Sequence, residues 1–431
     1  MPDQPADTHI ADLHAQAAEL GVEGYRLLKR PELIKAIESA GGTIEAPAPP
    51  EPEPEADEVV VEGAVLTGEE DEAVEEDAAG PREGDEPTEE VTGILDVMPQ
   101  RFGFLRLDRL EPAEGDVYIS ASQVRRCELR AGDEVTGPAR EPKRGERHKA
   151  LIHVDAVNGE EPQTAERPDF DALAPVQPER RLPLDTDAAD VLARSVDLLA
   201  PLALGQRVLV RSAPRSGRTT LLRSIARAVE AAEGVRLVVL LVDERPEEAT
   251  AWRESFADAE LAIATADLDP RDQMAVADLA LERSRRLAEV GQDVVLICDS
   301  LSRLAHAGGD SVAAKRLFGS GRNLAGGGSL TVIGTVLEGV GDEGQAERAV
   351  ITTESSLIAL DPELAAGGVV PALKIAECRV SNEDGLREAA ELEAARKLRS
   401  LLTDLDPAEA AALLRERIEG TPSNADLLGA L

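Results

Sequence analysis

The stretch "VRSAPRSGRTTLLRSIA", residues 210–226, decides the fold of this 431-residue chain. An apolar run, "GQRVLV", leads into it, and an amphipathic segment follows. This order predicts a strand, a glycine-containing loop and a helix, the context in which backbone N–H groups bind phosphate at the start of a helix. The usual pattern, GxxxxGK[ST], differs here because Ala213 takes the first glycine position and Arg218 the lysine position, while Gly217 and the Thr219 hydroxyl are in place.

Arg218 keeps the positive charge of the usual lysine, but a planar guanidinium fork is not equivalent to a compact ammonium. Taken alone, the loop is as compatible with a glycine-rich turn as with an active phosphate site. As a phosphate site it would bind ATP through the following residues: Ala213, Pro214, Arg215, Ser216, Gly217, Arg218, Thr219 and Thr220, together with Asp299.

Two further strand ends favour the ATP site. "RLVVLLVDERPEE" places Glu244 at the end of a buried strand, where it is a candidate general base for polarising a water. "DVVLICDS" ends in Asp299, the form of a Walker B site, where the acid and the Thr219 hydroxyl would hold Mg²⁺. Each segment alone could be an ordinary strand or a solvated turn. The three segments in this order predict a site for ATP and Mg²⁺.

The pattern around these motifs predicts an α/β fold. From residue 201 to 431 continuous apolar runs alternate with helical segments, as in a buried parallel sheet, so we expect an NTPase-like core with C-terminal helices. Residues 159–200 form a proline-rich connector that ends in a helix.

Residues 91–158 contain short β-rich runs and predict an OB-type barrel. Phe102 and Phe104 lie two residues apart and are flanked by arginines, and Tyr118 and the basic stretch 140–149 follow. Partly exposed aromatic rings beside positive charge favour single-stranded nucleic acid. The alternative is that both phenylalanines belong to the core of the barrel.

Charge is distributed unevenly. The net charge is −38, from 84 acids and 46 bases, but residues 46–90 alone carry 18 acids and one base. We expect residues 1–45 to form a helical hairpin and 46–90 a disordered acidic linker, so any nucleic-acid contact needs a local basic patch. The three cysteines lie far apart, which indicates reduced thiols. The polar N-terminal stretch and the lack of long apolar runs predict a cytoplasmic protein without a membrane span.

With these motifs assembled, the chain resembles the Rho family of bacterial transcription termination factors, which are ring-forming, RNA-dependent ATPases and helicases with a RecA-like core. The resemblance covers the barrel with "RFGFLRL" and is most specific in "VLLVDERPEEAT", "CDSLSRLA" and "KRLFGSGRNLAGGGSLTVIGT". Alanine also replaces the first loop glycine in that family. The resemblance implies a catalytic base at Glu244, a Walker B acid at Asp299, and Arg303 in the family's order. The predicted RNA-binding residues are Phe102, Phe104, Arg106, Tyr118, Glu146 and His148.

The resemblance also implies partners. We expect single-stranded RNA, RNA polymerase or its transcription complex, and a homohexamer or a mixed ring with another Rho. ATP and Mg²⁺ are the implied cofactors.

The departures from the family's pattern concentrate in the catalytic parts. Thr220 and Val370 stand where a methionine and an aromatic usually contact adenine, and a long channel-loop segment is reduced to residues 308–314. The second channel loop, in 337–350, lacks its lysine, and no arginine stands in the register of the arginine finger, Arg379 and Arg387 being nearest. Two alternatives therefore stand: a working helicase, or a hydrolysis-impaired Rho paralogue that acts as an RNA-binding or regulatory subunit.

Overall fold

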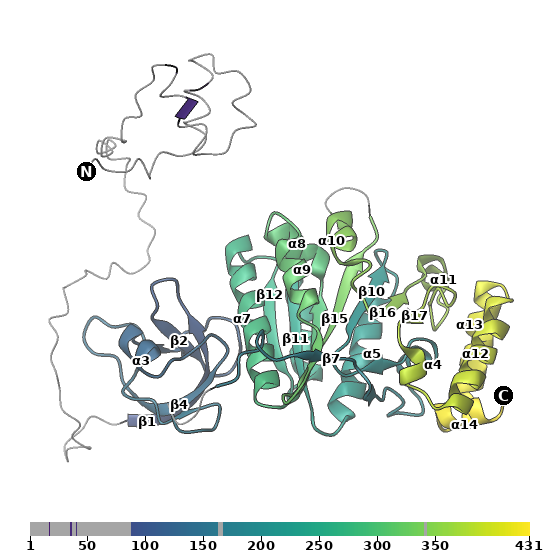
Figure 1. Ribbon diagram of the computed structural model, residues 1–431, viewed down its shortest axis with the longest axis horizontal. Helices are drawn as coiled ribbons and strands as arrows, with labels where there is room; N and C mark the ends of the chain where they lie inside the picture. The colour runs from purple at the N-terminus through teal and green to yellow at the C-terminus, as the bar shows by residue number, and fades with distance from the viewer. Residues whose placement is uncertain (1–16, 18–34, 37–39, 41–87, 163–166, 340–342) are drawn as a thin grey trace. The chain divides into compact units, whose positions relative to one another are not determined.

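A computed structural model describes residues 17, 35–36, 40, 88–162, 167–339 and 343–431 (Figure 1). The helical hairpin predicted for 1–45 and the linker predicted for 46–90 lie almost entirely outside these residues. The described residues from 88 onward belong to one compact unit, 79–431. Its first strand begins at Thr88 rather than at 91, since Thr88 pairs with Arg140.

The first part of this unit is a closed, five-stranded OB-like barrel. The strands follow the order β1-β2-β3-β5-β4, and an antiparallel β1–β4 pairing closes the barrel. A short strand, β6, pairs with β4, and one helix follows β3. The elements are β1 (Thr88–Val97), β2 (Gly103–Arg106), β3 (Val117–Ile119), α3 (Ala121–Arg126), β4 (Glu134–Arg140), β5 (Ala150–Leu151) and β6 (Ala156–Val157).

The barrel's core is built from alternate residues of these strands, as a period of two requires. Leu95, Leu105, Ile119 and Val135 are fully buried in it. Gly103 begins β2 because a Cβ there would lie 2.7 Å from both Asp96 O and a Leu95 methyl. Glycine therefore allows β2 to lie close against β1 between the two phenylalanines.

A connector with little regular structure leads from the barrel to the core. β8 and β9 form an antiparallel pair, and β7 pairs with β14 of the core. The connector's elements are β7 (Pro175–Val176), β8 (Arg181–Leu182), α4 (Val191–Leu199) and β9 (Leu202–Ala203).

The core is a sheet whose central strands are parallel, in the order β12-β11-β13-β15-β10-β16, with β17 antiparallel at one edge (Figure 1). This is the α/β arrangement expected from the apolar runs. Its elements are β10 (Arg207–Ser212), α5 (Arg218–Ala231), β11 (Val235–Glu244), α6 (Pro246–Ser255), β12 (Glu260–Thr265), α7 (Pro270–Glu289), β13 (Asp293–Asp299), α8 (Leu301–Ala307), α9 (Val312–Gly319), β14 (Arg322–Leu324), β15 (Ser329–Leu337), α10 (Glu343–Val350), β16 (Ser356–Ala359), α11 (Pro362–Ala366) and β17 (Arg379–Val380).

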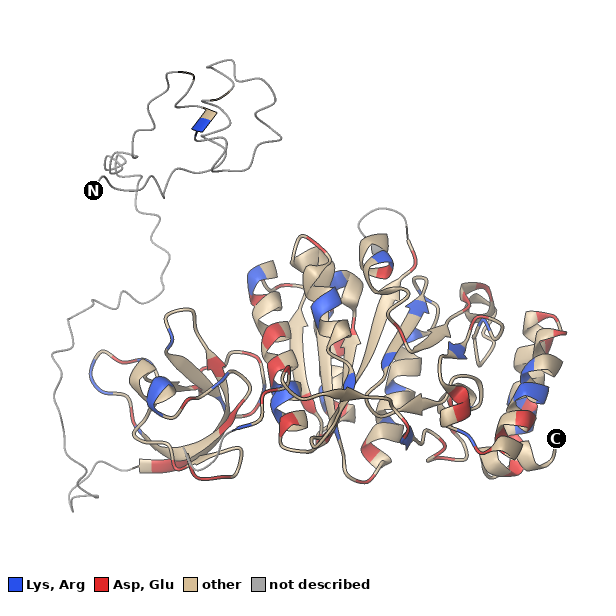
Figure 2. Ribbon diagram, viewed as in Figure 1, with Lys and Arg blue, Asp and Glu red and all other residues tan. Residues whose placement is uncertain are grey.

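Both faces of the sheet are covered. Along β11, Val239 and Leu241 pack with α5 and α6, whereas Val238 and Leu240 pack with α7 and α8. Both faces being buried explains why the strands read as continuous apolar runs. Charges of both signs are interspersed on the outer surfaces of the helices (Figure 2). No helix in the described part of the chain is long and apolar enough to cross a membrane.

Three C-terminal helices pack against α4 and the α5 side of the sheet. Arg194 in α4 is completely buried and donates to Asn424 Oδ1 at 3.0 Å and to the carbonyl oxygens of Ile418 and Thr421, both at 2.8 Å. A buried guanidinium is stable only when it is paired and hydrogen-bonded, so it fixes these helices to α4. They are α12 (Ala389–Thr403), α13 (Pro407–Glu419) and α14 (Asn424–Gly429), preceded by a short 3₁₀ turn at Glu383–Gly385.

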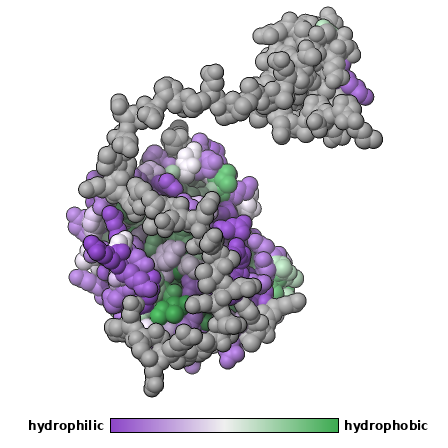
Figure 3. Space-filling model, turned by 90° about the vertical axis from the view of Figure 1, so that its left-hand side faces the viewer, coloured by the Kyte–Doolittle hydropathy of each residue, from purple (hydrophilic) through white to green (hydrophobic). Residues whose placement is uncertain are grey.

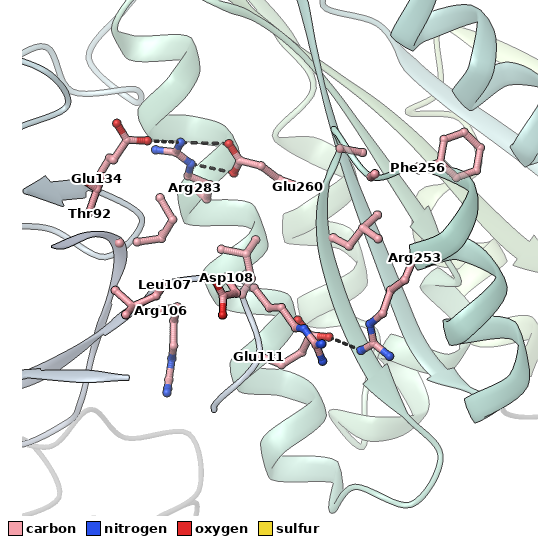
Figure 4. A pocket seen from close by; sticks show the side chains of 17 residues that line it. Thr92, Arg106, Leu107, Asp108, Glu111, Glu134, Arg253, Phe256, Glu260 and Arg283 are labelled. Atoms are coloured by element: carbon pink, nitrogen blue, oxygen red, sulfur yellow. Dashed lines mark hydrogen bonds and ion pairs between the residues drawn. The ribbon is translucent and has the colours of Figure 1, made fainter. Parts of the chain in front are cut away.

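Ion pairs also join the barrel to the core. Arg283 Nη2 in α7 lies 3.0 Å from Glu134 Oε2 in β4, and its Nε lies 2.8 Å from Glu260 Oε2 in β12. Arg253 Nη2 lies 2.7 Å from Glu111 Oε1. These pairs line a pocket of about 490 Å³ between the two parts (Figure 4). Because both arginines are already paired, this pocket is a polar boundary between the two parts.

Candidate functional site

Four aromatic rings gather on one face of the barrel. Phe104 in β2 lies opposite Tyr118 in β3, and the loop between β4 and β5 brings His148 against Phe104 with ring centres 5.0 Å apart. The ring centre of Phe102 lies 5.9 Å from that of Phe104 and 5.6 Å from that of Tyr118. All four rings are partly exposed, whereas Leu105, the residue after Phe104, is fully buried. Phe102 and Phe104 thus stand outside the barrel core and form a platform with the other two rings.

Figure 3 faces the end of the unit that carries the barrel. Where described residues form this surface, apolar side chains appear only in small areas among hydrophilic ones.

Arg106 lies in a different position from the one that a phosphate contact requires. Its side chain is only 6% exposed and forms ion pairs with Asp96 and Asp116. Its guanidinium carbon lies 5.6 Å from the centre of the Phe104 ring. The spacing "FGFLR" did not reveal this burial, because the two acids that pair with Arg106 come from β1 and from the loop before β3. Arg106 supports the ring from beneath.

Glu146 holds the loop that carries His148. Its carboxylate accepts from Arg140 Nη1 at 2.6 Å and Nη2 at 2.8 Å, and from the Lys143 backbone N–H at 2.8 Å. These contacts, the Arg140 hydrogen bond foremost, lower the pKa of Glu146 to about 2. Arg144 and Arg147 on the same loop are exposed and form no ion pair with any residue that the structure describes.

The predicted ATP residues come together at the carboxyl ends of the core strands. The loop Ala213–Gly217 follows β10, Glu244 ends β11 and Asp299 ends β13. Ligands of open α/β sheets bind at this edge. Gly217 has a left-handed backbone (φ 87°) directly before α5, and the Ser216 hydroxyl donates to Ala213 O at 2.8 Å. Pro214 and Arg215 are exposed at the loop's tip, and Thr219 and Thr220 lie in the first turn of α5.

The Arg218 side chain contacts Asp299, the residue at the Walker B position. Its Nε lies 2.9 Å from Asp299 Oδ1 and 3.3 Å from Oδ2. The Thr335 hydroxyl of β15 donates to Asp299 Oδ1 at 2.9 Å. Asp299 is 1% exposed, so its carboxylate is enclosed by these two partners. Sequence reasoning missed Thr335, although a threonine inside the apolar run "SLTVIGT" was a signal for a buried polar contact.

The Glu244 carboxylate is also paired with groups of the chain itself. Its Oε2 lies 2.7 Å from Arg303 Nη1 in α8, and its Oε1 accepts from the Arg245 backbone N–H at 3.0 Å. A register shift in β11 just before Glu244, with Asp243 at φ 53°, aims this side chain toward α8. Each of the two acids predicted for catalysis therefore has an arginine partner from the chain itself.

The two candidate substitutes for the arginine finger differ sharply. The Arg387 side chain is fully buried, pairs with Glu383 and Glu391, and donates to two carbonyl oxygens at the end of α4. It is therefore excluded as a residue that reaches another subunit. Arg379 is 55% exposed and pairs with Glu354 at 2.8 Å.

The other departures have simple structural counterparts. Only residues 308–311 join α8 to α9, so no long loop emerges there. The second predicted channel segment forms the end of β15 and α10, and residues 340–342 lie outside the described part. Val370 is 40% exposed.

The Mg²⁺ predicted at Thr219 and Asp299 does not fit these contacts. Protein-bound Mg²⁺ uses one or two carboxylates together with substrate phosphates. The one carboxylate at this position is already paired with a guanidinium and a hydroxyl, and the other acid nearby, Glu244, is paired with Arg303. Elsewhere in the described residues no cluster of three or more acidic, histidine or cysteine side chains offers a metal site.

These features define a class: an OB-like RNA-binding barrel joined to an α/β nucleotide-binding ATPase domain. Comparisons with known families agree with it. Residues 6–41 match "Rho termination factor, N-terminal domain", 91–163 match "Rho termination factor, RNA-binding domain", and 193–317 match "ATP synthase alpha/beta family, nucleotide-binding domain".

Relatives named transcription termination factor Rho are similar over most of the chain. The protein of Aquifex aeolicus is 36% identical over 79% of this chain and 84% of its own length, and that of Bacillus subtilis is 39% identical over 72% and 78%. The Streptomyces lividans protein is 38% identical over 78% of this chain, but the match spans only 51% of that longer relative. The chain belongs to the Rho family of transcription termination factors.

A solved structure of an ATPase from a bacterial type III secretion system aligns with 65% of this chain and 93% of its own, at 20% identity and a TM-score of 0.49.

Proposed function

We propose that this protein is a hydrolysis-impaired Rho factor that binds nascent single-stranded RNA through its aromatic platform and ATP through its core. The observation that carries the proposal is the contrast between four partly exposed rings on the barrel and two catalytic acids closed by arginines. Base stacking needs open ring faces, and each stacked base contributes about 1–3 kcal/mol.

The roles proposed for individual residues follow from their positions. Phe102, Phe104, Tyr118 and His148 stack bases, while Arg106 positions Phe104 from below and Glu146 positions the loop. The loop from Ala213 to Thr219 binds the phosphates of ATP, helped by the backbone N–H groups at the start of α5. Glu244 takes the catalytic-base position and Asp299 the Walker B position.

The proposed setting is the cytoplasm, on transcripts leaving RNA polymerase, in a homohexamer or a mixed ring with an intact Rho. An impaired subunit that occupies RNA would regulate termination rather than drive it. A working helicase is the second candidate, and Arg379, the more exposed of the two arginines, is the residue that favours it.

The test is RNA binding by the full chain. Phe102→Ala combined with Phe104→Ala removes two stacking rings and is expected to weaken binding of pyrimidine-rich RNA by at least about tenfold. Fluorescence anisotropy at one fixed salt concentration measures the change. Val312→Ala removes an exposed apolar side chain of α9 and serves as the control. Equal RNA affinity of the double variant and this control would refute the platform.

A further inference from the structure

Arg218 supplies positive charge beside Asp299, where a metal-dependent nucleotide site has a cation. It is the residue at the lysine position of the loop, and it also neutralises the Walker B acid, with Nε 2.9 Å from Asp299 Oδ1. In a usual phosphate loop, a lysine contacts the phosphates and a metal ion contacts the Walker B acid. Here Arg218 is in a position to make both contacts. Asp299 is almost completely buried, so a divalent ion could use this carboxylate only by displacing the guanidinium.

The guanidinium retains donors for a ligand. Arginine carries five N–H groups in a fixed fork, and the Nε contact with Asp299 uses one of them. The terminal amino groups of Arg218 have no hydrogen-bond partner among the described residues, and the side chain is 14% exposed. Arginine forks bind phosphate oxygens through two parallel hydrogen bonds.

The surrounding residues favour this arrangement over a metal. Thr335 fixes the Asp299 carboxylate from the opposite side, so the acid remains aimed at Arg218. Glu244 is held by Arg303 and is not available as a replacement ligand. Two arginines already balance the two acids, so neither carboxylate has an unpaired charge left to hold a dication.

We propose that this site takes the triphosphate of ATP without a divalent cation, with the Arg218 guanidinium bridging Asp299 and the phosphate oxygens. This inference rests on the proposed binding of nucleotide by the core. It adds a requirement that separates the site from metal-dependent ATP sites: affinity for ATP is set by Arg218 and is indifferent to Mg²⁺.

The experiment measures ATP binding by calorimetry on the full chain, in EDTA and in excess Mg²⁺. The unmodified protein is expected to show dissociation constants within about threefold of each other. In Arg218→Lys, the ammonium cannot bridge both groups, so affinity in EDTA is expected to fall at least about tenfold below affinity in Mg²⁺. Arg227→Lys, an exposed position of the same helix, is the matched control and should behave like the unmodified protein.

A second variant protects the test against misfolding of the first. Asp299→Asn keeps the shape of the side chain and leaves Arg218 free for phosphate, so ATP affinity in Mg²⁺ should stay within about threefold. A tenfold loss there, or ATP binding by the unmodified protein only when Mg²⁺ is present, would overturn the inference and leave the proposed nucleotide site intact. Absence of ATP binding in both buffers, with RNA binding retained, would overturn the nucleotide part of the proposed function as well.

Discussion

On the barrel, four rings remain partly exposed, and the loop that carries His148 extends Arg144 and Arg147 into solvent without an ion pair among the described residues. In the core, Asp299 and Glu244 lie at the expected strand ends, but each is closed by an arginine of the same chain. The binding groups of the barrel are accessible to a ligand, whereas the charged groups of the core pair with one another. Motif residues at the expected positions can thus be accessible in one domain and paired within the chain in the other.

The largest expected effect is on turnover. We expect RNA-dependent ATP hydrolysis at least about 10³-fold below the typical enzyme rate of about 10 s⁻¹, because loss of an arginine finger alone costs about 10³–10⁵. A steady-state phosphate-release assay with and without C-rich RNA measures it.

The Arg218→Lys variant extends this test, and it should raise the rate by less than about tenfold, because a lysine restores neither finger nor channel loops. Brisk turnover by the unmodified protein would contradict the impairment and make Arg379→Ala the next variant to assay.

The arginine that closes Glu244 provides a smaller effect, on stability. Arg303→Met leaves a buried carboxylate without its cation and should lower the free energy of unfolding by about 1–3 kcal/mol. The value falls toward the lower end because Arg303 is 24% exposed and partly screened by water. Urea unfolding measures the loss.

Two further variants decide whether the ion pair is the cause. Adding Glu244→Gln to Arg303→Met should recover most of the loss, since the charge left unpaired is removed. Arg316→Met breaks a pair whose partners are both about half exposed, and should cost less than about 1 kcal/mol. If both single variants cost the same, the closure of Glu244 contributes no special stability.

The two exposed arginines of the barrel's basic loop are expected to have a smaller effect, on the salt dependence of RNA binding. Arg144→Ala and Arg147→Ala should each reduce the slope of log affinity against log salt by about 0.7, the value for one phosphate contact on a single strand. A salt titration of RNA binding measures the slope. Arg415→Ala removes an exposed arginine of α13 and should leave it unchanged. Unaltered slopes in both loop variants would show that these arginines do not contact phosphate.

The smallest expected effect concerns the acidic segment, whose structure lies outside the described residues. Residues 46–87 contain 16 acids and one arginine. Replacing them with an uncharged linker of equal length should raise RNA affinity about two- to threefold at low salt, and screening should remove the gain near 0.1 M, where the Debye length is about 10 Å. Equal affinities at low salt would mean that the segment does not compete with RNA for the barrel.

Much of the fold could be predicted because it depends on periodic burial. The continuous apolar runs around Val239 and Ile297 indicated strands covered on both faces, and short β-runs indicated the barrel. Phe102 and Phe104 were expected on one face because they lie two residues apart. These inferences need only local spacing, which a sequence states directly.

The contacts that decide chemistry could not be predicted in this way. Arg106 is buried by acids from β1 and the loop before β3, and Arg387 is buried by α4, about 190 residues earlier in the chain. Arg218 could have faced solvent, and its contact with Asp299 depends on a rotamer and on a strand 81 residues away. Pattern analysis places such residues near a site, but it does not state which partner each one chooses.

Arg194 has a consequence for the order in which the protein can mature during synthesis. It pairs with Asp185 nearby in the chain, but Ile418, Thr421 and Asn424, which also accept from it, are translated more than 220 residues later. Until these residues leave the ribosome, the guanidinium lacks the helices that bury it. The α5 side of the sheet then also lacks its C-terminal cover. The C-terminal helices can therefore cover the nucleotide domain only after residues 418–424 have been translated, later than the whole barrel.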